Sequence, residues 1–519
     1  MKITKQFILL FVASLLIVGC DDDFVEVNTD PYAVNDVDPA LLFGGAQRIG
    51  TGSLQAENTI VQQFVNPYNQ GATLGFNFNA DIDGVNNGIW NDAYGGDLRN
   101  IIQALNLLDE DTERTNLENM IRIWKAHIFM RLVDTYGDVP YFEAGRAVSD
   151  IIFYPVYDDD EIIYENLHAE ITDAVASFNP NGEFVSEDLF YGENGSNPTN
   201  SASAQVEKWR KLGNSLLLRL GMRYSELNPS KAESIVSEAL NGGVMTSNDD
   251  NAYIVLDGIR NVNGRNNLLR DFPFFYYAAE PFVDQLKSTN DPRGTYILAT
   301  YDDPGAIVND PEPDTDLDNQ FGVPIGVTDV ELRDTSLGYR GARGAGLDYS
   351  QFNVYSVLSP AAPEEYVTYP QTALLLAEAA YRGWIDGDAQ EYYEEAITAH
   401  MQMYEIYPNT ASITMSEIES YLNEPEVAYD ESNALELINT QYWIVSFTNA
   451  AEAFANFRRS GYPNLNPNTF NDDLVAGGGF ANRFSYPDRE SSANAENYSA
   501  AAAAIGGDNL ISRVFWDIE

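Results

Sequence analysis

Apolar residues recur every three or four positions through several long stretches of the chain, a spacing that predicts amphipathic helices. One such helix is predicted to stop at Tyr136-Gly137-Asp138-Val139-Pro140, because Gly favours a left-handed turn and Pro prevents continuation. A second helix is predicted after the capping residues Asp158 to Asp160. The apolar faces consist of Leu117, Ile121, Trp124, Ile128 and Leu132 in the first helix, and of Ile163, Leu167, Ile171, Val175 and Phe178 in the second.

Further helices are predicted in both halves of the chain, and several of them follow one another as helix–turn–helix pairs. The predicted ranges are Val206–Ser225, Pro229–Leu240, Glu364–Arg382, Asp388–Tyr404 and Ala434–Phe457. Pairs of this length resemble stacked tetratricopeptide-like units, although no clean 34-residue repeat is present. The pattern predicts a mainly α fold.

Two long regions lack this periodicity. Val65–Trp90 and Asn241–Pro360 are rich in Gly, Asn, Asp and aromatic residues. Loops of this length in a compact protein are usually functional or disordered. Their aromatic content favours ordered, functional loops.

The amino terminus has the pattern of a signal peptide. Lys2 and Lys5 precede the apolar run Phe7–Val18, which is too short for a comfortable transmembrane helix. The run ends at Ile17-Val18-Gly19-Cys20, which resembles a bacterial lipobox, and Cys20 is the single cysteine of the chain. We therefore expect cleavage before Cys20 and lipidation of that residue, the alternative being an ordinary secretory peptide.

Composition narrows the function classes. The 519 residues include 29 Lys+Arg against 79 Asp+Glu, a formal net charge of −50. Such a surface repels phosphate backbones and anionic headgroups, so nucleic acid is not expected as a partner and only the lipid is expected to hold the membrane. With one cysteine, neither an internal disulfide nor a CxxC zinc pair can form.

A series of short motifs runs in order along nearly the whole chain. The motifs are Asn28-Thr29-Asp30-Pro31, Asp97-Leu98-Arg99-Asn100, Ile123-Trp124-Lys125-Ala126, Asp134 to Tyr141, Lys208 to Lys211, Asn290-Asp291-Pro292-Arg293, Leu376 to Ala380, Arg458 to Pro463 and Arg483 to Pro487. Each motif is weak alone, but their order, together with the lipobox, is distinctive. The series resembles the SusD/RagB family of nutrient-binding outer-membrane lipoproteins.

The resemblance implies a right-handed superhelix of helix pairs that supports an irregular ligand-binding region. It implies a non-catalytic protein that captures nutrient for a SusC-like TonB-dependent outer-membrane transporter. The expected organisation is a signal peptide (1–19), a lipidated tether (20–39) and one SusD-like domain (40–519). Within that domain we expect a helical scaffold at about 40–240 and 361–460, a loop-rich binding insertion at about 241–360 and an irregular segment at 461–519.

Aromatic residues are the strongest candidates for ligand binding. Aromatic faces stack on the apolar CH faces of sugar rings, and tyrosine hydroxyls can hold sugar hydroxyls, but the same residues would line a peptide groove or fill a core. The candidate residues are Tyr68, Phe76, Phe78, Trp90, Phe274, Tyr276, Tyr277, Tyr339 and Arg340.

Motifs for cofactors and catalysis are sparse. Asp314, Asp316 and Asp318 alternate as in a calcium loop, but Ile325 stands where an EF-hand has Glu, so a solvated acidic loop and a non-EF calcium site are the two interpretations. None of the three histidines lies in an HExxH motif, and no GxSxG elbow is present.

The leading hypothesis is a surface lipoprotein that binds a glycan or oligosaccharide. The same role for oligopeptides is the close alternative. A third hypothesis is a lipid-anchored glycoside hydrolase, because chance carboxylate pairs are unavoidable in so acidic a chain. The last is a periplasm-facing lipoprotein with a scaffold role.

Overall fold

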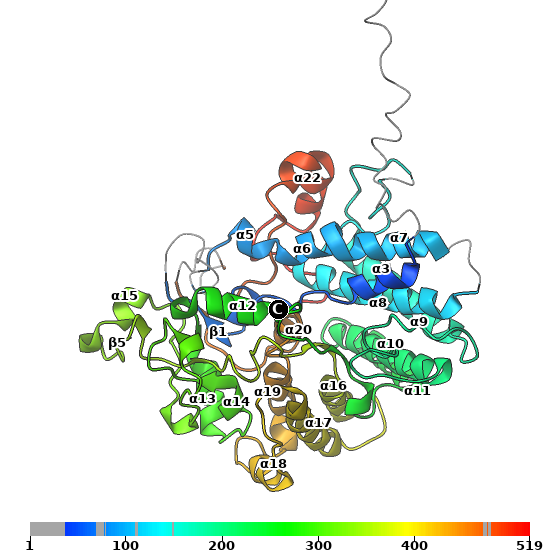
Figure 1. Cartoon of the computed structure of the whole chain (residues 1–519). Helices are drawn as coiled ribbons and strands as arrows, with labels where there is room; N and C mark the ends of the chain where they lie inside the picture. Colours follow the sequence, from blue (N-terminus) through cyan, green and yellow to red (C-terminus); the bar gives the residue numbers. More distant parts are fainter. Residues whose placement is uncertain are drawn as a thin grey trace, which may run out of the picture. The chain divides into compact units, whose positions relative to one another are not determined.

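Helices that follow one another along the chain pack against each other in pairs, and the pairs continue into a layer (Figure 1). In the first half, α8 packs on α9, α9 on α10, and α10 on α11; in the second half, α16 packs on both α17 and α19. Contacts between α10 and α16 join the two halves. The bounds of these helices are α8 Thr115–Tyr136, α9 Asp160–Ser177, α10 Ala202–Arg223, α11 Pro229–Gly242, α16 Tyr369–Tyr381, α17 Ala389–Met403 and α19 Ala434–Val445.

The computed structural model describes residues 37–68, 77, 79–108, 113–147, 150–470, 475 and 479–518. Residues 39–519 form one compact unit with a continuous apolar core under the helix layer. The prediction of a mainly helical fold is confirmed. In the described ranges, no helix combines the length and the apolar character needed to cross a bilayer.

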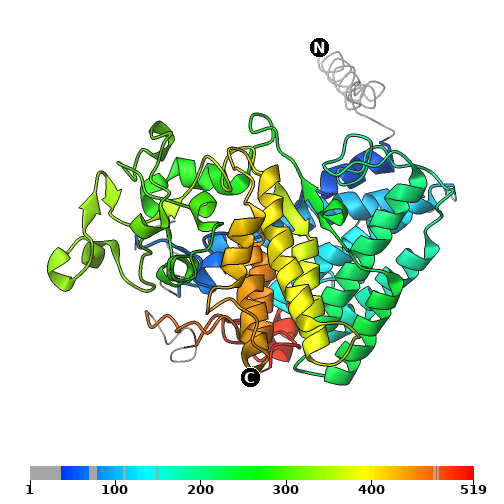
Figure 2. The ribbon, with the colours of Figure 1, turned by 90° about the horizontal axis from the view of Figure 1, so that it is seen from below.

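The remaining helices are shorter than those of the layer. Figure 2 shows the long helices side by side, with the short helices and loops of residues 264–347 gathered to the left of them. The bounds are α3 Pro39–Ala46, α4 Glu57–Ile60, α5 Asp83–Asn86, α6 Gly88–Asp92, α7 Leu98–Leu108, α12 Gly264–Asp271, α13 Glu280–Ser288, α14 Gly294–Ile297, α15 Asp329–Leu332, α18 Met415–Leu422, α20 Ala450–Ser460, α21 Glu490–Ala493 and α22 Ala495–Ala504.

Strands are short and antiparallel, and within the described ranges they form four two-stranded sheets. Each of three sheets joins segments far apart in sequence, whereas β5 and β6 form a local hairpin. The pairs are β1 (Phe64–Val65) with β3 (Tyr277–Ala278), β2 (Ala252–Ile254) with β8 (Glu364–Val367), β4 (Leu298–Ala299) with β7 (Gln351–Phe352), and β5 (Ala342–Arg343) with β6 (Gly346–Leu347).

The predicted helix stops are confirmed. α8 ends at Tyr136, where Gly137 takes a positive φ of 78°, and α20 ends at Ser460, where Gly461 is left-handed at φ 73°. Residues with a Cβ rarely adopt positive φ, so Gly suits both positions. Arg458 and Arg459 lie in the last turn of α20, near its negative end.

Two predicted helix ranges were wrong in part. Residues 364–367 form strand β8 instead of helix, and α16 begins at Tyr369 with Pro370 in its first turn. The predicted helix 434–457 is broken between Val445 and Ala450.

The break follows from tertiary hydrogen bonds made by the intervening polar residues. Ser446 Oγ accepts from Gln371, Thr448 Oγ1 donates to Glu365 of β8, and Asn449 Nδ2 donates to the Tyr366 carbonyl.

The regions predicted to lack helix contain several short helices. Val65–Trp90 includes α5 and most of α6, and Asn241–Pro360 includes α12 to α15. The carboxyl-terminal segment expected to be irregular contains α22. These helices are only four to ten residues long, too short for a clear apolar period.

Candidate functional site

Residues of the loop-rich segment 241–360, together with Val65 and Tyr68, form a small apolar cluster that is separate from the main core. Its buried members include Val65, Tyr68, Tyr277 and Leu347. The pairing of β1 with β3 sets Val65 opposite Tyr277. This register brings the chain on either side of Tyr68 next to the aromatic run that begins at Phe272.

Aromatic rings gather at the edge of this second cluster. The Tyr68 ring meets Phe274 and Phe275 edge-on, with ring centroids 5.7 Å and 4.9 Å apart. The centroids of Phe274 and Phe275 are 4.2 Å apart, and that of Phe272 is 6.0 Å from Phe275. Phe272 is 48% exposed, while Phe274 and Phe275 are half-buried. We call Tyr68, Phe272, Phe274 and Phe275 the aromatic cluster; it presents ring surface to solvent on a tightly packed base.

The hydroxyl of Tyr68 is held by charge and by hydrogen bonding. Arg333 Nη2 donates to Tyr68 Oη over 3.0 Å, although the two residues are far apart in sequence. Burial raises the pKa of Tyr68, and the guanidinium of Arg333 opposes that rise. Tyr68 therefore stays a neutral phenol in a fixed orientation near neutral pH.

Tyr339 and Arg340 lie next to the second apolar cluster. Tyr339 packs, partly buried, against it. Arg340 lies over the Phe321 ring with its guanidinium carbon 3.7 Å from the ring centroid, and its Nη2 is 3.0 Å from Asp348 Oδ2. Lys287 Nζ is 4.2 Å from the same ring centroid. The guanidinium of Arg340 is therefore engaged by the Phe321 ring and by Asp348, which leaves it fewer N–H groups for a ligand.

Three of the sequence candidates lie inside the protein. Trp90 is 3% exposed and packs on Tyr136 of α8, with ring centroids 5.3 Å apart. Tyr276 and Tyr277 are 1% and 0% exposed. The Tyr276 hydroxyl accepts from Gln55, and that of Tyr277 accepts from the Leu347 backbone N–H.

These three residues have core roles in the structure, and we do not retain them as ligand contacts. Burial of large aromatic rings stabilises cores, which accounts for their position. Phe76, Phe78 and Cys20 lie outside the described residues.

The structure adds residues to the site that were not among the sequence candidates. Phe272 and Phe275 belong to the same aromatic run as Phe274, so the density of that run already pointed to them. Arg333 and Phe321 have no such signal, because only folding brings them to Tyr68 and Arg340.

The carboxylates of Asp314, Asp316 and Asp318 are exposed and do not converge on a shared point. Asp314 Oδ1 accepts from the Asp316 backbone N–H, and Asp316 Oδ1 accepts from that of Asp318. Asp314 Oδ2 accepts from Asn319 Nδ2 over 2.7 Å. The geometry is that of a turn whose aspartates bind their own backbone.

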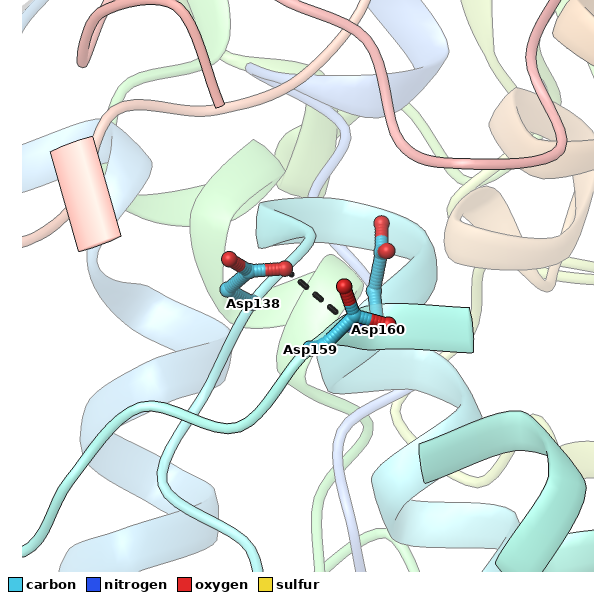
Figure 3. A group of neighbouring side chains, drawn as sticks. All are labelled: Asp138, Asp159 and Asp160. Carbon is cyan, nitrogen blue, oxygen red and sulfur yellow. Dashed lines mark hydrogen bonds between the residues drawn. The ribbon is translucent and has the colours of Figure 1, made fainter. Parts of the chain in front are cut away.

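Another aspartate group does converge in the described part of the chain. Asp138, Asp159 and Asp160 bring one oxygen each within 4.8 Å of one another (Figure 3). Asp138 Oδ1 accepts from the Asp160 N–H, Asp159 caps α9 through the Ile162 N–H, and Asp160 Oδ2 accepts from the Phe515 N–H. Burial raises the pKa of Asp138 to about 6 and, together with Asp138, that of Asp160 to about 7. These bonds tie the end of α8, the start of α9 and the carboxyl terminus together.

Comparison with known proteins places these features in a family context. Residues 40–487 match the SusD-like family described as starch-binding associating with outer membrane. A solved chitin-binding protein is 29% identical, with a TM-score of 0.77 over 93% of this chain and 100% of that one. A chitin-binding SusD homolog from Flavobacterium johnsoniae is 21% identical, with a TM-score of 0.72 over 92% and 98% of the two chains. No curated protein sequence matches the chain.

Proposed function

The chain belongs to the SusD-like family of outer-membrane nutrient-binding proteins, and on that premise we propose that it captures a glycan and delivers it to a TonB-dependent transporter. SusD-like binding proteins are non-catalytic, so the hydrolase hypothesis is not pursued. The observation that carries the glycan assignment is the aromatic cluster, in which Phe272 is about half exposed and packs beside Phe275.

Three features support a glycan as the ligand, and the first two favour it over a peptide. The family description names starch, and two structures of the same fold are described as chitin-binding. Closely spaced rings suit stacking on the CH faces of pyranoses. We therefore propose Phe272, Phe274 and Phe275 as stacking residues and Tyr339 as a hydroxyl partner, with the buried Tyr68 packed edge-on against Phe274 and Phe275. An oligopeptide remains the alternative ligand.

Titration calorimetry tests the ligand and the site together. Purified protein would be titrated with chitin, malto- and xylo-oligosaccharides and with a mixed peptide pool. Phe274→Ala and Phe272→Ala should each weaken binding of the preferred glycan by about 1–3 kcal/mol, the usual cost of removing an aromatic anchor. Phe153→Ala is the matched control, because it removes an exposed ring that lies outside the aromatic cluster.

Binding of the peptides but of no glycan would favour the oligopeptide alternative. Unchanged glycan affinity in both cluster variants, with folding intact by circular dichroism, would move the site elsewhere.

We further propose that Cys20 carries the lipid anchor and that the protein faces the cell exterior. The support is the sequence: Cys20 follows the apolar run Phe7–Val18 and is the single cysteine. Two or more acyl chains anchor a protein stably, since each buried methylene contributes about 0.8 kcal/mol. Protection of the protein from protease added to intact cells would contradict surface exposure.

An exposed apolar segment is proposed as part of the transporter contact. Ile151, Phe153 and Tyr154 are all more than 60% exposed. The backbone of this segment is fixed by hydrogen bonds, because Asn497 Nδ2 donates to the carbonyls of Tyr154 and Pro155. Large apolar side chains held outward on a fixed backbone are typical of protein interaction surfaces.

A further inference from the structure

One guanidinium beside the aromatic cluster has hydrogen-bonding capacity that the described residues do not use. Arg333 follows α15, and its Nη2 donates to Tyr68 Oη over 3.0 Å, the one hydrogen bond of this guanidinium within the described part of the chain. Its Nε lies 3.9 Å from Asp329 Oδ2, which is beyond hydrogen-bonding distance. A guanidinium has five N–H donors, so four of them stay available. The side chain is 36% exposed, which leaves these donors open to a ligand.

Tyr68 connects Arg333 to the rings proposed to stack on sugar. Its ring meets Phe275 and Phe274 edge-on, with centroids 4.9 Å and 5.7 Å apart, while its hydroxyl accepts from Arg333. Tyr68 itself is buried, so a ligand would touch the phenylalanine rings and the arginine but not the phenol. Arg333 therefore lies one side chain away from the stacking rings.

Backbone hydrogen bonds hold α15 beside the aromatic cluster. The Asp329 N–H donates to the Pro67 carbonyl over 2.9 Å, next to Tyr68 in the chain. The Gly341 N–H, just before β5, donates to the Leu332 carbonyl of α15 over 3.1 Å, and both elements lie at the same edge of the loop-rich segment (Figure 1). The 3-10 turn that carries Phe274 packs beside β6 of the same hairpin. The position of Arg333 is thus fixed by the fold.

Two other arginines of the loop-rich segment are already paired with carboxylates. Arg340 Nη2 is 3.0 Å from Asp348 Oδ2, and Arg343 Nη2 is 3.3 Å from Asp302 Oδ1. Arg333 differs from both, because its nearest carboxylate is too far away for a hydrogen bond. Its unused donors are therefore the ones that favour a ligand acceptor.

The charges around Arg333 select the kind of acceptor. Asp329 lies close to its Nε, and Glu331 and Asp334 are exposed in the same short segment. A ligand carboxylate would be attracted by one guanidinium and repelled by three carboxylates. A neutral oxygen avoids that repulsion. A guanidinium only donates, so a carbonyl oxygen, which only accepts and has two lone pairs, suits its planar fork better than a hydroxyl does.

We propose that Arg333 is a specificity-determining residue, which donates hydrogen bonds to the carbonyl oxygen of an acetamido group on a sugar stacked against the aromatic cluster. The proposal names an acetamido glycan as the ligand class, and it rests on the proposed glycan role of that cluster. Tyr68 is a positioning residue in this arrangement, because it holds one N–H of the guanidinium and leaves the others for the ligand.

Two tetrasaccharides test the proposal by titration calorimetry on the purified full chain. Chitotetraose and cellotetraose share one backbone and differ at C2, where the first has an acetamido group and the second a hydroxyl. We expect chitotetraose to bind at least about tenfold more tightly, the usual effect of a hydrogen bond to a charged group. Arg333→Met should weaken chitotetraose about tenfold and leave cellotetraose within about twofold. Arg333→Lys, which keeps the charge but not the fork, should also lose selectivity.

Arg343→Met is the matched control. It makes the same change at an arginine of similar exposure, 34% against 36%, whose guanidinium is paired with Asp302. It should leave the affinity for both tetrasaccharides unchanged. Circular dichroism checks the folding of each variant, and if Arg333→Met does not fold, Arg333→Lys carries the comparison.

Failure of this proposal can be told apart from failure of the glycan role. Phe274→Ala should weaken both tetrasaccharides, because a ring stacks on either; no binding of both sugars, or no effect of Phe274→Ala, would refute the glycan role itself. With that role intact, equal affinity for the two sugars overturns the Arg333 proposal. So does an equal loss for both in Arg333→Met, which would show that Arg333 acts only through Tyr68. Tighter binding of a glucuronate tetrasaccharide than of chitotetraose would also overturn it.

Discussion

Neutralising Glu378 should destabilise the fold more than any other single carboxylate change considered for this protein. Glu378 of α16 is fully buried and is held by Arg459 of α20, with Nη2 to Oε2 at 2.7 Å and Nη1 to Oε1 at 2.8 Å. Arg382 and Asn439 of α19 also bind its oxygens. One carboxylate therefore ties three helices of the scaffold together.

The expected loss in the free energy of unfolding follows from the same contacts. Burial by itself would raise the pKa of Glu378, but attraction to Arg459 and Arg382 outweighs it and lowers the pKa from 4.5 to about 2. A drop of this size corresponds to roughly 3 kcal/mol, at about 1.4 kcal/mol per pH unit. Removing one partner of a buried ion pair costs about 3–5 kcal/mol. We expect Glu378→Gln to lose about 3–4 kcal/mol at pH 7.

Urea unfolding followed by far-UV circular dichroism measures this loss, with Glu226→Gln as the matched control. Glu226 contacts the same Arg382, but its side chain is 43% exposed, so its loss should cost less than about 1 kcal/mol. Since the folded pKa of Glu378 is depressed, its contribution is present above pH 4.5 and disappears as the pH falls toward 2. The gap between wild type and Glu378→Gln should therefore narrow below pH 4.5. Equal losses in the two variants, or a gap below 1 kcal/mol at pH 7, would refute the reasoning.

Three further outcomes are expected. Asp160→Asn should raise the thermal midpoint more at pH 8 than at pH 5. The raised pKa of Asp160, about 7 against an ordinary 3.8, destabilises the fold increasingly as the pH rises from about 4 to about 7, and Asn keeps the acceptor for Phe515. The same midpoint change at both pH values would contradict this. Cys20→Ser should move the protein from the detergent phase to the aqueous phase in Triton X-114 partitioning, and unchanged partitioning would rule out the lipid. The double variant Phe153→Ser, Tyr154→Ser should reduce co-purification of the transporter without changing glycan affinity, and full recovery of the transporter would exclude that surface.

Long amphipathic helices could be predicted because their period is local. Leu117 to Leu132 and Ile163 to Ile171 repeat every three or four residues, and both helices form with those residues buried. The stops at Gly137 and Gly461 were also predictable, because positive φ is a local requirement. The segment 364–367 could not be predicted as a strand, since it pairs with residues about a hundred positions earlier.

The candidate site was only partly predictable for the same reason. Phe274 and Tyr276 are neighbours in one aromatic run, yet Phe274 reaches the surface and Tyr276 lies in the core. No period separates them, because the run passes from a short 3-10 turn into strand β3. The partners that decide exposure, Gln55 for Tyr276 and Arg333 for Tyr68, come from distant segments.

The sequence by itself determined the family, the helical scaffold and the expectation of a lipid at Cys20, because each depends on spacing along the chain or on a short motif. Only the tertiary structure decided which aromatic rings face solvent and that Glu378 of α16 meets Arg459 of α20 inside the scaffold. The burial of a side chain and the pairing of two charges depend on contacts between residues far apart in the chain. Local periodicity in the sequence does not predict such contacts.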